Sequence, residues 1–199
     1  IRLPLHQYLV FHYAPADIQF PHDLSAQEAV GFPQKCVSIG LDADNIPNKK
    51  RALDIGCAVG RSTFELARTF AEVIGIDQSQ AFVDAANELK LNGRHPATMH
   101  EEGSKARDLD LRLDEAIDRD KVSFRTGDAQ ELPPDLGLFD AVLACNLICR
   151  LPQPRALLQR LPDLVKPGGQ LFLTTPFTWM EKYTSRENWL GQDGQDSFE

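Results

Sequence analysis

An α/β fold with a mostly parallel sheet and helices on both faces is the architecture that this sequence predicts. From residue 51 onward, short apolar runs alternate with stretches of helical periodicity. The first run ends in a glycine-bearing turn that leads into a helix. The 199 residues are 42% hydrophobic and 25% charged, which suits one globular domain with a real core.

Residues 1–50 are expected to be irregular, with an aromatic-rich stretch at 8–13 followed by scattered prolines. A short helix is expected at 25–30, where Ser25 is a candidate N-cap and Glu28 completes a capping box. We expect this part to form a cap over the rest of the domain, which spans 51–199.

The regular part begins with a strand at Arg51–Ile55, a tight turn at 56–60 and a helix at 61–69. A second strand at 72–76 ends at Asp77. Each boundary coincides with a change from apolar to glycine-bearing or polar sequence.

The next helix is expected to start at Ser79 as N-cap and to run to about Leu89, before Asn92 and Gly93. An insertion at about 91–120 follows. Leucines at 109, 111 and 113 favour an extended segment, whereas the spacing of 113 and 117 suits a helix. The many charged residues of this insertion are compatible with a solvated face or with a lid over the substrate.

Three strands remain, at 121–125, Phe139–Cys145 and 170–175, with a helix at 154–164 between the last two. The turn at 167–169, Pro-Gly-Gly, leads into the last strand. Such alternation predicts parallel strands with right-handed crossovers.

The formal net charge of −8 opposes a nucleic-acid partner, because phosphate binding needs a basic face. No stretch approaches the roughly 20 apolar residues of a membrane span, and the first residues lack signal-peptide zones. We therefore expect a cytoplasmic protein. The cysteines are expected to be reduced thiols without a metal, because no CxxC pair occurs; they are Cys36, Cys57, Cys145 and Cys149.

The turn after the first strand carries the central chemical signal. Gly56 and Gly60 form a GxxxG spacing, with Asp54 two residues before the first glycine. This differs from the GxGxxG of dinucleotide sites. An acid at this place suits a ligand with a cationic amino group better than a pyrophosphate. A purely structural tight turn is the alternative.

Three further signals follow the later strands. Asp77 stands where an acid accepts hydrogen bonds from ribose hydroxyls, although it could also serve as a helix cap. Asp128 and Ala129 follow Gly127, where they could meet adenine or remain solvated. Asn146 follows the strand at Phe139–Cys145. Together these signals indicate a nucleoside ligand with an amino-acid end.

In this order and spacing, the signals at about 50–176 resemble the Rossmann-like class I methyltransferases that depend on S-adenosylmethionine (SAM). The resemblance implies that SAM lies across the carboxyl ends of the strands and leaves as S-adenosylhomocysteine (SAH), without a metal. The cofactor-binding residues that it implies are Tyr13, Asp54, Gly56, Cys57, Ala58, Gly60, Arg61, Asp77, Gln78, Ser79, Asp128, Ala129 and Asn146.

Four segments together, 8–13 (Tyr-Leu-Val-Phe-His-Tyr), 53–62, 146–151 and 175–179 (Thr-Pro-Phe-Thr-Trp), resemble the mercaptohistidine N-methyltransferase family. This implies methyl transfer from SAM to an imidazole nitrogen of 5-mercaptohistidine, giving ovothiol. Members are usually fused to a sulfoxide synthase, and some stand alone, so the resemblance is compatible with a synthase partner or a fused domain.

The resemblance and the chemistry suggest catalytic roles for His12, Asn146 and Arg150. His12 could act as a general base or be a structural histidine. Arg150 could bind the substrate carboxylate or its thiolate, or lie on the surface. The substrate-binding residues are expected to be Tyr8, Phe11, His12, Arg150, Thr175, Phe177 and Trp179, although such aromatics also fill cores.

The sequence departs from the family at Cys149, where an Asp is expected before the arginine. It also ends at Glu199, whereas the fold usually adds two strands. Rival functions are a nucleotide-dependent oxidoreductase, a methyltransferase for another small molecule, and a non-catalytic SAM-binding module. Binding of SAM rather than NAD would exclude the oxidoreductase. The range of acceptors would identify a different methyltransferase, and detectable turnover would exclude the non-catalytic module.

Overall fold

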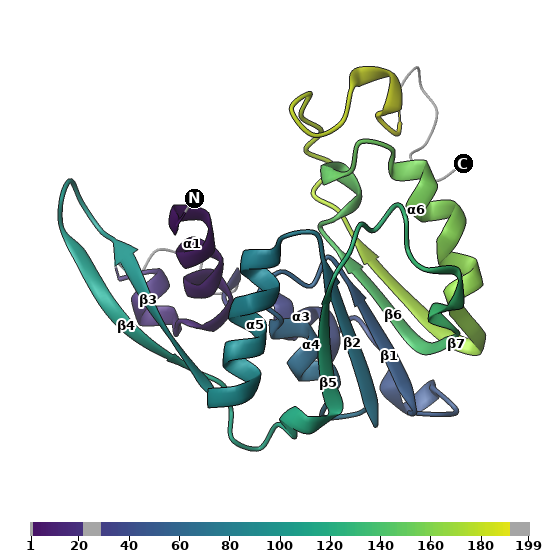
Figure 1. Cartoon of the computed structure of the whole chain (residues 1–199), viewed down its shortest axis with the longest axis horizontal. Coiled ribbons are helices and arrows are strands. Elements are labelled where there is room, and N and C mark those ends of the chain that lie inside the picture. The colour runs from purple at the N-terminus through teal and green to yellow at the C-terminus, as the bar shows by residue number, and fades with distance from the viewer. Residues whose placement is uncertain (1, 22–28, 192–199) are drawn as a thin grey trace.

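The computed structural model describes residues 2–21 and 29–191. Its centre is a five-stranded sheet in the order β5-β2-β1-β6-β7 (Figure 1). Every neighbouring pair in this sheet is parallel, as the sequence predicts. In spatial order the strands are β5 (Val122–Thr126), β2 (Glu72–Asp77), β1 (Arg51–Ile55), β6 (Phe139–Cys145) and β7 (Val165–Thr174).

Two apolar cores, one on each face of the sheet, place helices on both sides. Alternate residues of β1 divide between them, because successive side chains of a strand point to opposite faces. Ala52 belongs to one core with Phe64 of α4 (Arg61–Leu66) and Leu89 of α5 (Gln80–Asn92). Leu53 belongs to the other, with Leu157 of α6 (Pro154–Arg160).

The prediction of an irregular N-terminal region is wrong for residues 2–13, which form the helix α1 (Arg2–Tyr13). Leu5, Leu9 and Tyr13 recur every four residues and pack on the α4/α5 core. Aromatic and polar residues in the same segment obscure the helical period of these three positions in the sequence. Shorter helices follow at α2 (Ala16–Gln19) and α3 (Phe32–Ser38). The helix expected at 25–30, with its Ser25 cap, falls mainly outside the described residues.

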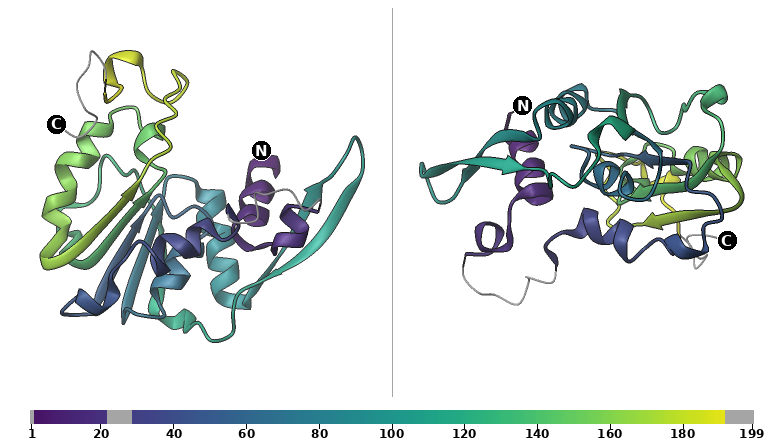
Figure 2. Two further views of the ribbon diagram at one scale, coloured as in Figure 1. Left: turned by 180° about the vertical axis from the view of Figure 1, so that it is seen from behind. Right: turned by 90° about the horizontal axis from the view of Figure 1, so that it is seen from below.

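The insertion contains an antiparallel hairpin of β3 (Arg94–His100) and β4 (Ala106–Arg112). The extended alternative is therefore confirmed, and a helix there is wrong. Ala97 and Leu111 face the core, while the rest of the hairpin extends beyond the sheet alongside α1 (Figures 1 and 2). The amide of Thr98 donates to His6 Nδ1 at 3.0 Å, which joins the hairpin to α1.

Helix boundaries follow local chemistry where the caps are strong. Ser79 caps α5 by accepting from the Phe82 amide at 3.4 Å, and Gly93 ends the helix with φ 69°. α4 ends at Leu66, earlier than expected, and α6 ends at Arg160 before a 3-10 turn. Among the described residues, no helix combines the length and apolar character needed to cross a bilayer.

The last strand starts earlier than the sequence suggests. β7 begins at Val165 and includes residues 167–169, which were expected to form a turn before it. A register shift between Phe139 and Ala141 lets the strand accommodate these residues.

Asp140 ties the starts of three strands together. Its buried carboxylate accepts from Lys166 Nζ at 2.9 Å, from the Arg51 amide at 2.8 Å and from the Lys50 amide at 3.2 Å. Lys166 thus pairs with a carboxylate, and the two amides are satisfied away from water.

Asp140→Ala is expected to lower the free energy of unfolding by about 2–3 kcal/mol, because it leaves two backbone amides without their partner and removes the ion pair with the partly exposed Lys166. Glu72→Ala, which removes an exposed ion pair with Arg51, is the control, with an expected change below about 1 kcal/mol. Urea unfolding measures both. Equal effects of the two substitutions would contradict the structural role of Asp140.

Candidate functional site

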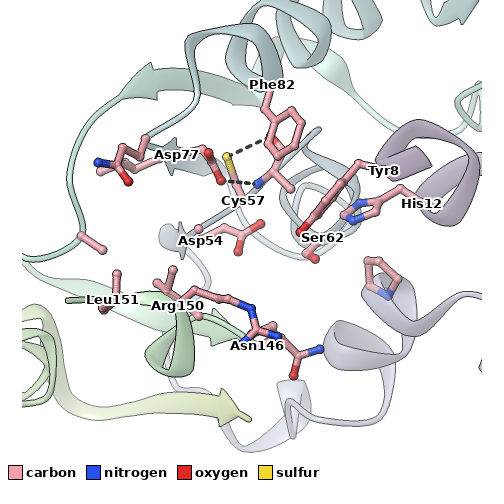
Figure 3. Close-up of a pocket in the computed structure, with 18 of the residues that line it drawn as sticks. Tyr8, His12, Asp54, Cys57, Ser62, Asp77, Phe82, Asn146, Arg150 and Leu151 are labelled. Carbon is pink, nitrogen blue, oxygen red and sulfur yellow. Dashed lines mark hydrogen bonds between the residues drawn. The ribbon is translucent and has the colours of Figure 1, made fainter. Parts of the chain in front are cut away.

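A cavity of about 560 Å³ opens at the carboxyl ends of the parallel strands, where open α/β sheets bind ligands (Figure 3). Its walls combine the loops after β1, β2, β5 and β6 with α1, α3, the first turns of α4 and α5, and one residue beyond β7. The lining residues are Gln7, Tyr8, Phe11, His12, Phe32, Pro33, Asp54, Gly56, Cys57, Ala58, Ser62, Ile76, Asp77, Gln78, Phe82, Gly127, Asp128, Ala129, Cys145, Asn146, Leu147, Arg150, Leu151 and Tyr183.

The turn after β1 is fixed by the end of β2. The amides of Gly56 and Cys57 donate to the Ile76 carbonyl at 2.8 and 3.0 Å. Gly56 has φ 74°, and a Cβ there would lie 2.9 Å from Leu147 Cδ1. Glycine is required for both reasons, because the position is left-handed and closely packed.

Asp77 contributes both to this turn and to the cavity. Its Oδ2 accepts from the Ala58 amide at 2.8 Å and its Oδ1 from the Ser79 amide at 2.9 Å. Burial raises its pKa, and the two backbone hydrogen bonds oppose that rise. Each oxygen retains a lone pair for a ligand hydroxyl. The two roles weighed for Asp77, helix start and ligand contact, are thus structurally compatible.

Asp54 is a buried carboxyl group that faces the same cavity. Its Oδ2 accepts from the Thr63 hydroxyl at 2.7 Å. Burial, with a smaller contribution from the Asp77 charge, raises its pKa to about 7. A buried acid whose hydrogen-bond partner is neutral favours a cationic ligand, because the cation stabilises its ionised form.

His12 is a neutral group at the edge of the cavity. Its Nδ1 is buried and has no hydrogen-bond partner in the part of the chain that the structure describes. Burial, followed by the Arg61 charge, lowers the pKa of His12 to about 3. We expected its pKa to be adjustable toward neutrality for general-base catalysis, and burial shifts it the other way. A hydrogen-bonding role is compatible with this environment.

Four expected cofactor residues stand behind the cavity wall rather than on it: Tyr13, Gly60, Arg61 and Ser79. The Tyr13 hydroxyl donates to the Val59 carbonyl at 2.8 Å, which joins α1 to the turn after β1. Arg61 lies 5.4 Å from the Tyr13 ring centroid and pairs with Glu65 at 2.7 Å. These contacts support the wall from outside.

The later loops complete the site. Asp128 and Ala129 line the cavity, and Asp128 Oδ1 accepts from the Gln130 amide at 2.8 Å. Asn146 has φ 55°, and its amide donates to the Thr174 carbonyl at 2.9 Å. A non-glycine residue in this region is strained, which is frequent at functional sites.

The segment after β7 differs from expectation. Thr175, Phe177 and Trp179 do not line the cavity. The Thr175 hydroxyl accepts from the Phe177 amide at 3.1 Å, and Trp179 packs on the α6 core. Tyr183, which the sequence did not single out, lines the cavity instead.

Phe82 was also missed. Its ring lies 4.7 Å from that of Tyr8, centroid to centroid, over the cavity. A signal was available, because Phe82 stands three residues after the predicted cap Ser79 and so occupies the first turn of α5. The remaining missed lining residues are Gln7, Phe32, Pro33, Ser62, Ile76, Gly127, Cys145, Leu147 and Leu151.

A family model described as a methyltransferase domain matches residues 53–171, more than half of the chain. The chain belongs to this methyltransferase family. The matched region contains Asp54, Asp77, Asp128 and Asn146. The domain is thus of the SAM-dependent class, with SAM as its cofactor.

Curated relatives include ubiquinone biosynthesis O-methyltransferases. That of Coxiella burnetii is 26% identical over 126 residues, which are 63% of this chain and 43% of the relative. That of Xanthomonas oryzae is 29% identical over 126 residues, 63% of this chain and 42% of the relative. The chain therefore spans less than half the length of these relatives.

Solved structures share the fold. The [4+2]-cyclase SpnF has a TM-score of 0.57 at 22% identity, over 87% of this chain and 56% of its own. A putative sarcosine dimethylglycine methyltransferase from Galdieria sulphuraria has a TM-score of 0.54 at 15% identity. The match covers 75% of this chain and 47% of that protein. The N-terminal domain of EvdMO1 with SAH bound has a TM-score of 0.51 at 21% identity. The match covers 71% of this chain and 48% of that domain.

The chemistry of the lining residues is compatible with SAM. The buried carboxylate of Asp54 would complement the ammonium group, and Asp77 would accept hydrogen bonds from ribose hydroxyls. Asp128 and Ala129 could hold the adenine.

The affinity for SAH is expected to increase as the pH is raised from about 6 to 8. Asp54 is protonated below its pKa of about 7 and attracts an ammonium group only when ionised. Asp54→Asn should weaken binding about 10- to 100-fold and leave it nearly independent of pH over this range. Titration calorimetry measures both. The exposed Asp163→Asn is the control; a pH dependence that persists in Asp54→Asn would exclude Asp54 as its source.

Gly56→Ala is expected to weaken SAH binding at least about tenfold and to destabilise the protein by about 1–3 kcal/mol. The added methyl meets Leu147 and strains a left-handed residue. Gly103→Ala is a matched control, because Gly103 has φ 56° but no atom within 4 Å of an added Cβ. Thermal unfolding and calorimetry compare the two. If both variants bound SAH equally, close packing at the turn would not matter for the cofactor.

Proposed function

We propose that this domain transfers the methyl group of SAM to an imidazole ring nitrogen of 5-mercaptohistidine, giving ovothiol. The observation that carries the proposal is the neutral His12, which lines the cavity beside a slot of aromatic rings formed by Tyr8, Phe11 and Phe82. A flat heteroaromatic acceptor fits such a slot and can form a hydrogen bond with the imidazole edge that faces the cavity.

The aromatic slot is built by residues that the family resemblance singles out. Tyr8, Phe11 and His12 lie on α1 and face the cavity. Centroid distances from the His12 ring are 5.8 Å to Tyr8 and 5.5 Å to Phe11. The ring of Phe82 lies 4.7 Å from that of Tyr8, centroid to centroid. These rings would hold an imidazole and exclude water around the reacting nitrogen.

SAM, when bound, supplies an electrophilic methyl group. The acceptor nitrogen already carries a lone pair when the imidazole is neutral, so orientation is the main requirement. With a pKa of about 3, His12 is poorly suited to remove a proton at neutral pH. We assign it the role of a hydrogen-bond partner that orients the acceptor, and Asn146 a place beside the reacting groups.

The same resemblance supports a division into a cap at 1–50 and a cofactor-binding part at 51–199 with an insertion at about 91–120. The Tyr13–Val59 hydrogen bond joins the two parts at the turn after β1. The family resemblance also supports a sulfoxide synthase, as a partner or a fused domain, that makes the acceptor.

An alternative is methylation of another small molecule. The named O-methyltransferase relatives favour an oxygen acceptor, but their likeness covers only 126 residues. A non-catalytic SAM-binding module is a further alternative. Both predict no turnover of mercaptohistidine.

Incubation with SAM and 5-mercaptohistidine is expected to give SAH and a product heavier by one methyl group, identified by mass spectrometry. Histidine, the control without the thiol, should react far more slowly. SAH formation with a phenol or catechol acceptor but not with mercaptohistidine would favour the O-methyltransferase alternative. Tight SAM binding without any turnover would favour the non-catalytic module.

A further inference from the structure

The cavity contains acidic groups and one arginine on separate walls. Asp54 and Asp77 come from the ends of β1 and β2, whereas Arg150 comes from the 3-10 turn Ile148–Arg150 after β6 (Figure 3). Tyr8 lies within electrostatic reach of both walls. Burial raises its pKa, the Asp77 charge and Tyr183 add to that rise, and the Arg150 charge opposes it. A ligand in contact with Tyr8 thus lies between opposite charges.

Arg150 is held in place by neutral groups. Its Nη1 donates to the Thr178 carbonyl at 2.8 Å and to the Cys149 carbonyl at 3.0 Å. Its Nη2 donates to the Thr178 hydroxyl at 3.2 Å. The guanidinium carbon lies 5.2 Å from the centroid of the Tyr183 ring. These contacts orient the guanidinium and leave its positive charge available to a ligand.

The segment that supplies Thr178 and Tyr183 is anchored next to the site. The buried Thr184 hydroxyl donates to the Leu151 carbonyl at 2.6 Å. The indole nitrogen of Trp189 donates to the Thr184 carbonyl at 2.8 Å. Because Thr184 adjoins Tyr183, these bonds fix the ring against Arg150.

We infer that Arg150 binds a carboxylate of the methyl acceptor and that Tyr183, which holds the guanidinium, is a specificity-determining residue for acceptors with that carboxylate. This rests on the proposed function, which supplies an amino-acid acceptor. The planar fork of an arginine matches a carboxylate in two parallel hydrogen bonds. SAM and an amino-acid acceptor both carry a carboxylate, so the affinity for SAH has to be measured to separate the two possible partners of Arg150.

The test compares 5-mercaptohistidine with its decarboxylated analogue, the corresponding mercaptohistamine, as acceptors. For the unaltered protein, kcat/KM should be about 10- to 100-fold lower with the analogue, because a charge-assisted pair is lost. Tyr183→Leu should raise KM for mercaptohistidine about tenfold and leave kcat/KM for the analogue within about twofold. Tyr183→Phe retains the ring and should behave like the unaltered protein.

Met180→Ala is the matched control, since it alters an exposed side chain of the same segment that does not line the cavity. The dissociation constant of SAH is measured for every variant and should stay constant. A weaker SAH complex in Tyr183→Leu would show that Arg150 serves the cofactor instead, which overturns the inference.

The outcomes separate this inference from the proposed function. If both acceptors are methylated equally well, the carboxylate is not recognised and the inference falls while the function stands. If neither is methylated, the proposed function falls and the inference with it. If Tyr183→Leu slows both acceptors alike, Tyr183 has a structural role only and its assignment to specificity is wrong.

Discussion

The hydrogen bonds between the turn after β1 and the end of β2 are the constraint on which the rest of the site depends. The Ile76 carbonyl accepts two amides of the turn, and Asp77 accepts a third from Ala58. The close contact of Gly56 with Leu147 then sets how near the loop after β6 can approach. Tyr13 attaches α1 to the same turn through Val59. Cofactor contacts and the N-terminal helix therefore share one support.

The cofactor side and the acceptor side of the cavity have different origins in the chain. The family match at 53–171 covers the strands and loops that carry the acidic residues. Tyr8, His12 and Tyr183 lie outside it. The comparisons accordingly establish the methyltransferase class, whereas the aromatic residues that we propose for the acceptor on α1 and at Tyr183 lie in the flanking segments, and Arg150 lies within the match. Substrate assignment thus needs experiments on α1 and on the segment around Tyr183.

Local sequence signals predicted the sheet well, because each depends on a few neighbouring residues. β1 and β6 have the predicted bounds, and Ser79 and Gly93 bracket α5 as expected. Positions at strand ends were also predictable, since parallel strands bring their carboxyl ends together. Asp54, Asp77, Asp128 and Asn146 accordingly meet at one cavity.

Features set by tertiary contacts were harder to predict. Helix α1 depends on burial of Leu9 against the α4/α5 core, and β7 gains its first residues by pairing with β6. Tyr183 reaches the cavity because Thr184 is anchored to Leu151, a contact between residues 33 positions apart. No spacing within the segment could have selected Tyr183 over Phe177.

If the buried Asp54 binds the ammonium group of the cofactor, cofactor binding is coupled to the ionisation of this carboxyl group. Because burial raises the pKa of Asp54 to about 7, part of the population carries a proton on this carboxyl at neutral pH. A bound ammonium group favours the ionised form, so that proton is released to the buffer as the ligand enters. The heat of binding at pH 7 should therefore contain the ionisation enthalpy of the buffer. In a cell, the supply of cofactor and the local acidity would then act on this domain through the same carboxyl group.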